Sequence, residues 1–178
     1  MAALFKKYTF EDYKVRKATV EDTEAVIKIL RDAAIHLNEK GIVQWEYLRS
    51  GNENDEMKRA ISDGETYVVE SKYGLAATFN LSAKQNEWDM EMWGKRNDHA
   101  YYIHRLAVAE NARNKQVGKK ILAWLDNNIL LKDGYIRLDC VANNAVLNDY
   151  YRQAGFTFIA YAGEGENRFS LYEKAFLR

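Results

Sequence analysis

The chain has 178 residues, of which 47% are hydrophobic, and this is enough to bury the core of one ordinary globular domain. The composition excludes a disordered, fibrous or disulfide-stapled protein. Lysine and arginine together number 26, and so do aspartate and glutamate, so no bulk positive charge exists to hold a nucleic acid or an anionic membrane. Any anion that the protein binds must be held by a local group of donors.

The N-terminal segment MAALFKKYTFEDYK lacks the apolar stretch of a signal peptide, and no apolar run is long enough to span a membrane. The one cysteine, Cys140, cannot form an intramolecular disulfide, and we interpret it as a buried thiol in a reducing compartment. We therefore expect a cytoplasmic protein without a membrane partner. Both a monomer and a homodimer are compatible with the sequence.

The spacing of apolar residues predicts helices and strands in the first half of the chain. These are a strand around Val15, a helix from Thr19 to about Gly41, a short helix over 55–62 and a hairpin of strands 66–69 and 75–81. Thr19 is a good helix cap with Asp22 three positions later, and Gly41 is a typical helix stop. Residues 85–99 show no clear period, and we interpret them as an irregular excursion.

The second half alternates strands with helices. The predicted elements are strand 101–109, helix 115–130, strand 135–142, helix 145–154 and strands 156–161 and 168–173. Hairpins give antiparallel neighbours, whereas a strand–helix–strand step favours parallel ones. We therefore predict an α/β fold with a mixed central sheet of about six to seven strands flanked by about four helices. No proline and no linker-like segment occurs, so residues 1–178 are expected to form a single domain.

A short basic loop joins the strand ending near Val108 to the next helix. A helix N-terminus carries unbonded N–H groups and the positive end of the helix dipole, so this loop can hold a phosphate or pyrophosphate. It is not a nucleotide-binding P-loop, because Arg113 stands where that motif needs glycine and Lys120 where it needs serine or threonine. The alternative is an ordinary solvated basic first turn.

A second informative segment runs from Leu138 to Phe156. A strand leads to Asn144, a helix then places Tyr151 two turns later on nearly the same face, and Gly155 ends the helix. Asn144 is a residue type that caps helices, and we predict that it caps this one.

Together the two segments resemble the GNAT superfamily of N-acetyltransferases, which transfer an acetyl group from acetyl-coenzyme A to an amine. The first resembles the family's Val-x-x-x-x-Arg/Gln-x-x-Gly-x-Gly loop through Val108, Arg113 and Gly118. The second resembles its Asn-Tyr-Gly-Phe segment. The resemblance spans roughly residues 13 to 175, and the fragments 41–45 and 104–108 are similar to an uncharacterised bacterial branch. Gln116 replaces the first loop glycine, so its side chain either weakens coenzyme binding or points outward.

The resemblance implies a set of residues that bind acetyl-coenzyme A as co-substrate. They are Leu106, Val108, Arg113, Asn114, Lys115, Gln116, Val117, Gly118, Lys119 and Asn144. Backbone N–H groups of 116–119 would bind the pyrophosphate, and the strand at 106–108 would pair with the pantetheine arm. A backbone N–H near Val108 would polarise the thioester carbonyl. Tyr151 matches the family's acid for the leaving thiolate, with packing on the sheet as the alternative.

A base is needed to remove a proton from the acceptor ammonium, and His104 is the candidate because it lies in an otherwise apolar strand. A structural histidine is the alternative. Tyr102, on the same side of that strand, and Trp45 are candidate acceptor contacts. The charged Arg105 is expected to pair with Asp139 for structural reasons. His36 and His99 are expected at the surface.

These expectations define an enzyme that acetylates a primary amine of an unidentified acceptor and uses no metal. The alternative is a non-catalytic module that binds acyl-coenzyme A as a regulatory ligand. The replacement of the first loop glycine by Gln116 is the feature that favours this alternative. A nucleic-acid-binding protein is disfavoured by the zero net charge.

Overall fold

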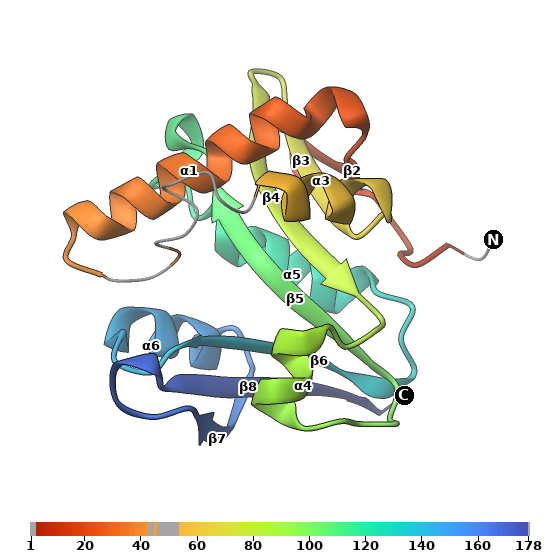
Figure 1. The fold of residues 1–178 in the computed structure, drawn as a ribbon. Coiled ribbons are helices and arrows are strands. Elements are labelled where there is room, and N and C mark those ends of the chain that lie inside the picture. Colours follow the sequence, from red (N-terminus) through yellow and green to blue (C-terminus); the bar gives the residue numbers. More distant parts are fainter. Residues whose placement is uncertain (1–2, 43–44, 46–53, 178) are drawn as a thin grey trace. The chain divides into compact units, whose positions relative to one another are not determined.

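The computed structural model describes residues 3–42, 45 and 54–177. The strands form a sheet of eight in the order β1-β2-β3-β4-β5-β6-β8-β7, and the described residues contain five α-helices (Figure 1). The predicted α/β class is confirmed, but the predicted six to seven strands and four helices are each too few. By its internal contacts the chain divides into unit 1, residues 1–81 and 105–129, and unit 2, residues 82–104 and 130–178. The expectation of a single domain stays a prediction.

Unit 1 holds the antiparallel strands at the N-terminal end of the sheet. Its elements are β1 (Thr9–Phe10), β2 (Tyr13–Lys17), α1 (Thr23–Glu39), α3 (Asn54–Ser62), β3 (Thr66–Ser71), β4 (Gly74–Ser82) and α5 (Val117–Asn128). The β3–β4 hairpin and the helices agree with the spacing of apolar residues. The two-residue β1 is too short to leave such a pattern.

The two faces of the unit 1 strands are covered by different helices, as Figure 1 shows. Val68 of β3 packs in one cluster with Leu30 of α1 and Met57 of α3. The neighbouring Tyr67 points to the other face and stacks on Phe79, which in turn contacts Trp124 of α5. Successive strand residues thus serve opposite core layers.

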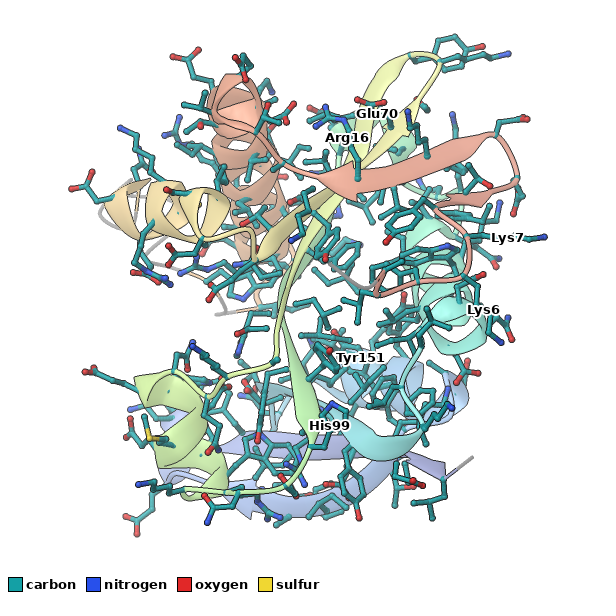
Figure 2. All side chains as sticks on the ribbon, turned by 90° about the vertical axis from the view of Figure 1, so that its right-hand side faces the viewer. Lys6, Lys7, Arg16, Glu70, His99 and Tyr151 are labelled. Carbon is teal, nitrogen blue, oxygen red and sulfur yellow. The ribbon has the colours of Figure 1, made fainter. Side chains whose placement is uncertain are left out.

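The first helix starts as predicted near Thr19, but through a 3₁₀ turn, Val20–Asp22, that forms a capping box with Thr19. Arg16 lies 2.6 Å from Asp22 and 2.6 Å from Glu70, which ties this turn to the end of β3 (Figure 2). Gly41 follows the helix with a φ of 76°, a conformation that favours glycine, and it ends the helix as predicted.

Unit 2 contains the C-terminal strands and the first part of β5. Its elements are α4 (Glu87–Trp93), β5 (Ala100–Val108, of which residues 100–104 belong here), β6 (Asp133–Val141), α6 (Ala145–Gln153), β7 (Thr157–Ala162) and β8 (Phe169–Leu177). β5 and β6 are parallel, and their ladder runs from Ala100–Tyr135 to Tyr102–Arg137. The parallel step predicted around a crossover helix is confirmed. β8 pairs antiparallel with both β6 and β7.

The helix α4 lies within the segment that we expected to be irregular, and that expectation is wrong. Asn86 and Asp89 form a capping box at its start, and Trp93 near its end is buried. Seven residues are too few to show a helical period, although the Asn-x-x-Asp cap is visible in the sequence.

α4 and α6 cover opposite faces of the unit 2 strands. Leu171 of β8 packs with Trp93 of α4, whereas the next residue, Tyr172, packs against Tyr151 of α6. Because Asp139 pairs with Leu171 and Leu138 with Tyr172, Asp139 faces α4 and Leu138 faces α6. Among the described residues, no helix combines the length and apolar character needed to cross a membrane.

Candidate active site

The basic loop of unit 1 contains two residues with left-handed backbone, Asn114 with a φ of 64° and Gln116 with a φ of 57°. Gln116 therefore adopts a conformation that glycine enters without strain, at a cost of roughly 1 kcal/mol for a residue with a side chain. Its side chain is exposed. The replacement keeps the turn and directs the side chain outward, and α5 begins just after it at Val117 rather than at the predicted Lys115.

The first turn of α5 has unused backbone donors. Gln116, at the N-cap, makes no side-chain capping bond, and its carbonyl accepts from the N–H of Lys120 at 3.1 Å. The N–H groups of 117–119 therefore have no partner within the helix and point out of its positive end. This is the geometry that binds an anion.

The basic side chains of this loop have different partners. Lys115 and Lys119 are exposed, so they are available to an anion. Lys120 pairs with Glu11 at 3.1 Å. Arg113 donates from one guanidinium nitrogen to the carbonyl of Asp32 at 3.2 Å, which anchors it to α1 and leaves other N–H groups of the fork.

β5 contains one irregular residue, because Arg105 has a φ of 53°, a left-handed conformation unusual for arginine. Leu106 and Val108 follow and are half-buried. In unit 1, Arg59 and more weakly Arg105 lower the pKa of Glu56, so Arg105 has an acidic neighbour in its own unit. The ion pair predicted between Arg105 and Asp139 stays a prediction.

The start of α6 is fixed by two asparagines. Asn144 caps the helix, as predicted, by accepting from the N–H of Leu147 at 3.1 Å. The buried Asn148 donates to the carbonyl of Asn144 at 2.7 Å and accepts from the hydroxyl of Tyr172 at 2.6 Å. Sequence reasoning missed Asn148, although a second asparagine one turn after a cap is a visible signal. These bonds hold the β6–α6 turn in one conformation.

Tyr151 lies on α6 with only 9% of its surface exposed, and it is labelled in Figure 2. Its ring contacts those of Tyr150, Phe156 and Tyr172, with centroids 5.3, 6.1 and 6.0 Å away. Burial raises the pKa of the phenol, and nearby Cys140, Tyr150 and Asp139 raise it further. The phenol therefore keeps its proton throughout the neutral range, as a proton donor requires.

A polar cluster forms on the α4 side of unit 2. His104 Nε2 lies 3.0 Å from Oδ1 and 3.1 Å from Oδ2 of Asp89, which is 1% exposed. Trp88 Nε1 donates to Oδ2 of Asp139 at 3.1 Å. Burial raises the pKa of Asp139 to about 6, against the opposing effects of His104 and of the Trp88 hydrogen bond. Sequence reasoning proposed His104 as the base, named Asp139 only as the expected partner of Arg105, and did not name Asp89.

One ligand atom from each of Asp89, His104 and Asp139 lies within 4.8 Å of the other two, a spacing compatible with a divalent cation. Two hydrogen-bonding contacts occupy atoms that a cation would need. His104 Nε2 faces both oxygens of Asp89, and the indole N–H of Trp88 donates to Asp139. We therefore interpret the cluster as a proton-binding group.

The two predicted acceptor contacts have structural surroundings. Tyr102 is 3% exposed, and its hydroxyl accepts from Arg137 at 3.0 Å. Arg137 is itself buried and bonds Asp98 and Glu173, so Tyr102 belongs to an interior network, and its contact with the acceptor stays a prediction. Trp45 packs against the α1 core cluster of unit 1, and its contact with the acceptor stays a prediction.

Trp88 is the tryptophan that borders the polar cluster. It is 38% exposed and contacts Phe169 edge to face at 4.9 Å. Of the other histidines, His99 is exposed as expected and His36 is half-buried. Cys140 is a buried free thiol, as predicted, and burial raises its pKa to about 12.

The family profile described as "Acetyltransferase (GNAT) domain" matches residues 62–158. The uncharacterised N-acetyltransferase YesJ of Bacillus subtilis is 31% identical over 159 residues, covering 88% of this chain and 87% of YesJ. A GNAT-family acetyltransferase structure from Streptococcus agalactiae has a TM-score of 0.80 at 15% identity, covering 97% of this chain and 100% of that one. The PaiA N-acetyltransferase of Thermoplasma acidophilum, solved in complex with coenzyme A, has a TM-score of 0.61 at 19% identity, covering 93% and 100%.

The fold and these similarities define the protein's class as an α/β protein with the GNAT fold. Because the profile covers more than half of the chain and YesJ exceeds 30% identity over most of it, the chain belongs to the GNAT family.

Proposed function

We propose that the protein transfers the acetyl group of acetyl-coenzyme A to a primary amine. The coenzyme pyrophosphate is bound by the N–H groups at the start of α5, with Arg113, Lys115 and Lys119 adding positive charge. The strand at 106–108 pairs with the pantetheine arm, and Asn114 and Asn144 complete the coenzyme contacts. The coenzyme A held by the PaiA enzyme supports this assignment.

The amine must lose a proton before it attacks. An alkylammonium with a pKa of about 10 is neutral in only about one molecule per thousand at pH 7, so a positioned base raises the reactive fraction. His104 is that base. Its Nδ1 takes the ammonium proton, the nitrogen lone pair then forms the C–N bond, and a backbone N–H near Val108 stabilises the thioester oxyanion.

The C–S bond then breaks, and the coenzyme leaves as a thiolate that takes up a proton. The nitrogen of the intermediate gives up its second proton as the amide forms, and that proton replaces the one donated to the thiolate. Tyr151 is the proposed donor. Cys140 indicates how these surroundings affect a thiol: burial raises the pKa of Cys140 to about 12, so its thiolate is strongly basic. A coenzyme thiolate formed in similar surroundings is likewise a strong base, so the high pKa of Tyr151 does not prevent the transfer.

One observation carries the proposal: Gln116 adopts the left-handed conformation that a glycine would supply, so the turn into α5 is retained although the motif glycine is not. This favours a working coenzyme site over a degenerate one.

The test incubates the purified protein with acetyl-coenzyme A and a panel of primary amines. Thiol release and a product mass increased by one acetyl group are followed together, with the no-amine reaction as control. We expect amine-dependent thiol release with at least one class of amine. Coenzyme binding without thiol release from any amine would instead identify a regulatory acyl-coenzyme A module.

A further inference from the structure

Three ionisable side chains from three elements of unit 2 meet just beyond the end of the β5–β6 ladder. The last pair of that ladder is Tyr102 with Arg137, and His104 and Asp139 each lie two residues further along their strands. Asp89 comes from the first turn of α4. The cluster thus forms where the two parallel strands stop pairing.

Asp89 determines the tautomer of His104. Both carboxylate oxygens lie within 3.1 Å of Nε2, and an ionised carboxylate has only acceptors, so neutral His104 carries its proton on Nε2. The lone pair is then on Nδ1. The Oδ1 atom of Asp89 is fully buried and receives no well-aligned hydrogen bond from the described residues, so the imidazole is its nearest source of positive charge. Asp89 therefore favours the protonated form of His104.

Asp139 is coupled to the same imidazole. The groups that face it are Asp89 and Trp88 of α4, His104 of β5 and, across β6, Tyr151 of α6; its pairing partner on β8 is Leu171, and the next residue on β6 is Cys140. Of these, His104 is the only one that can carry positive charge. The buried Asp89 and the half-buried Asp139 lie beside one imidazole, and two carboxylates with one imidazole leave a net negative charge, which favours the uptake of a proton.

The cluster and Tyr151 lie on opposite faces of β6. Asp139 faces α4, whereas Cys140 faces α6, where its charge and that of Asp139 affect the phenol. Acetyl transfer removes a proton from the amine and delivers one to the departing thiolate. The polar cluster on one side of β6 can accept the proton of the amine, and Tyr151 on the other side can donate a proton to the thiolate.

We propose that Asp89, His104 and Asp139 act as one proton-accepting group, in which Asp89 is a positioning residue that holds the imidazole and Asp139 shares the proton that the imidazole takes up. The inference rests on the proposed function and deepens it. The ammonium N–H bond breaks, its proton bonds to Nδ1 of His104, and Asp139 stabilises the resulting imidazolium; the freed electron pair remains on the amine for attack.

The test compares the wild type with Asp89→Asn and Asp139→Asn. In Asp89→Asn the amide oxygen can still accept from the backbone N–H of Asn86, so the α4 cap is retained. We expect kcat to fall by roughly ten- to a thousandfold, with KM changed by less than about threefold. Both variants should move the rising pH limb of the rate lower by about one pH unit, because each loses a negative charge beside the imidazole.

A spectroscopic readout independent of activity accompanies the kinetics. Ring ¹⁵N chemical shifts of His104, assigned with His104→Gln, should show the proton on Nε2 in the wild type and a mixture of tautomers in Asp89→Asn. The matched control is Asp98→Asn, which removes an aspartate of the same unit that bonds Arg137 instead of His104. Asp98→Asn should lower stability without changing the tautomer or the pH limb.

Folded Asp89→Asn and Asp139→Asn variants with an unchanged tautomer and pH limb would overturn the inference. So would tight binding of Co²⁺ by the wild type, with visible absorption that Asp89→Asn loses, because the cluster would then be a metal site. If no amine is acetylated by the wild type, the proposed function fails, whereas the ¹⁵N measurement still decides whether Asp89 holds His104.

Discussion

Tyr151 shares its aromatic surroundings with a neighbour of the same chemistry, which allows its role to be tested directly. If it protonates the leaving thiolate, Tyr151→Phe should lower kcat by roughly ten- to a thousandfold while coenzyme affinity is retained. The ring and its packing on Tyr172 and Phe156 remain, so the change removes only the hydroxyl. Steady-state kinetics and calorimetric coenzyme titration measure the two effects.

The matched control is Tyr150→Phe. Tyr150 is the preceding residue, half-buried, and burial raises its pKa to about 12, so it offers a similar phenol pointing elsewhere. This variant should keep the wild-type rate. A Tyr151→Phe enzyme that turns over normally per folded molecule but melts earlier would assign Tyr151 to the core instead.

Individual residues differ in how far the sequence reveals them. The cap at Asn144 and the thiol of Cys140 follow from local residue type, and the structure confirms both. The role of Asp89 does not follow from its residue type, because its partner His104 is fifteen residues away on another element. The partner of Tyr102 is not visible in the sequence either, since the buried Arg137 that donates to its hydroxyl lies on a different strand. Side-chain partners brought together by tertiary packing leave no local signal.

At the scale of the element, the N-terminus of α5 allows a sharp test of coenzyme binding. Gly118→Asp puts a negative charge in the first turn, which stabilises the helix through its dipole but repels a pyrophosphate. We therefore expect a folded protein whose Kd for acetyl-coenzyme A rises at least about tenfold, or roughly 1.4 kcal/mol, by calorimetry.

Gly118→Asn is the control, because it adds a side chain of nearly the same size without the charge. Its Kd should rise less than that of Gly118→Asp, and the difference between the two should shrink at high salt. Equal affinity of folded Gly118→Asp and wild type would remove the pyrophosphate from this helix.

Elements were predictable where they repeat an apolar pattern over several turns. α1, α5 and the β3–β4 hairpin do so, and each lies close to its predicted bounds. α4 is a single short helix made by its cap and by burial of Trp93, so its period is invisible. It is also the element that contributes Asp89, so missing the helix meant missing the partner of His104.

At the scale of the whole molecule, the sheet class followed from connection rules. A helix between β5 and β6 implied a parallel pair, and the short turns implied antiparallel ones, as observed. The strand count was too low because β1 has only two residues. The boundary between the two units falls between His104 and Arg105, where Arg105 has a left-handed backbone within β5. This irregular residue was not predictable, because arginine rarely adopts this conformation.

Ligand linkage gives a prediction for the whole chain. A ligand that binds only the folded protein stabilises it by about 2.7 kcal/mol at a hundred times its Kd. For a chain of this size each kcal/mol raises Tm by about 2–4 °C, so saturating acetyl-coenzyme A should raise Tm by roughly 5–11 °C. Scanning calorimetry at several coenzyme concentrations measures this, and the rise should follow the logarithm of the free concentration. Gly118→Asp at the same concentration should show a smaller rise, because its Kd is weaker. A wild-type Tm that does not change with the coenzyme would contradict binding, because no stabilisation would be present. An equal rise of Tm in the wild type and in Gly118→Asp would contradict binding at α5, because the stabilisation would then come from elsewhere on the chain.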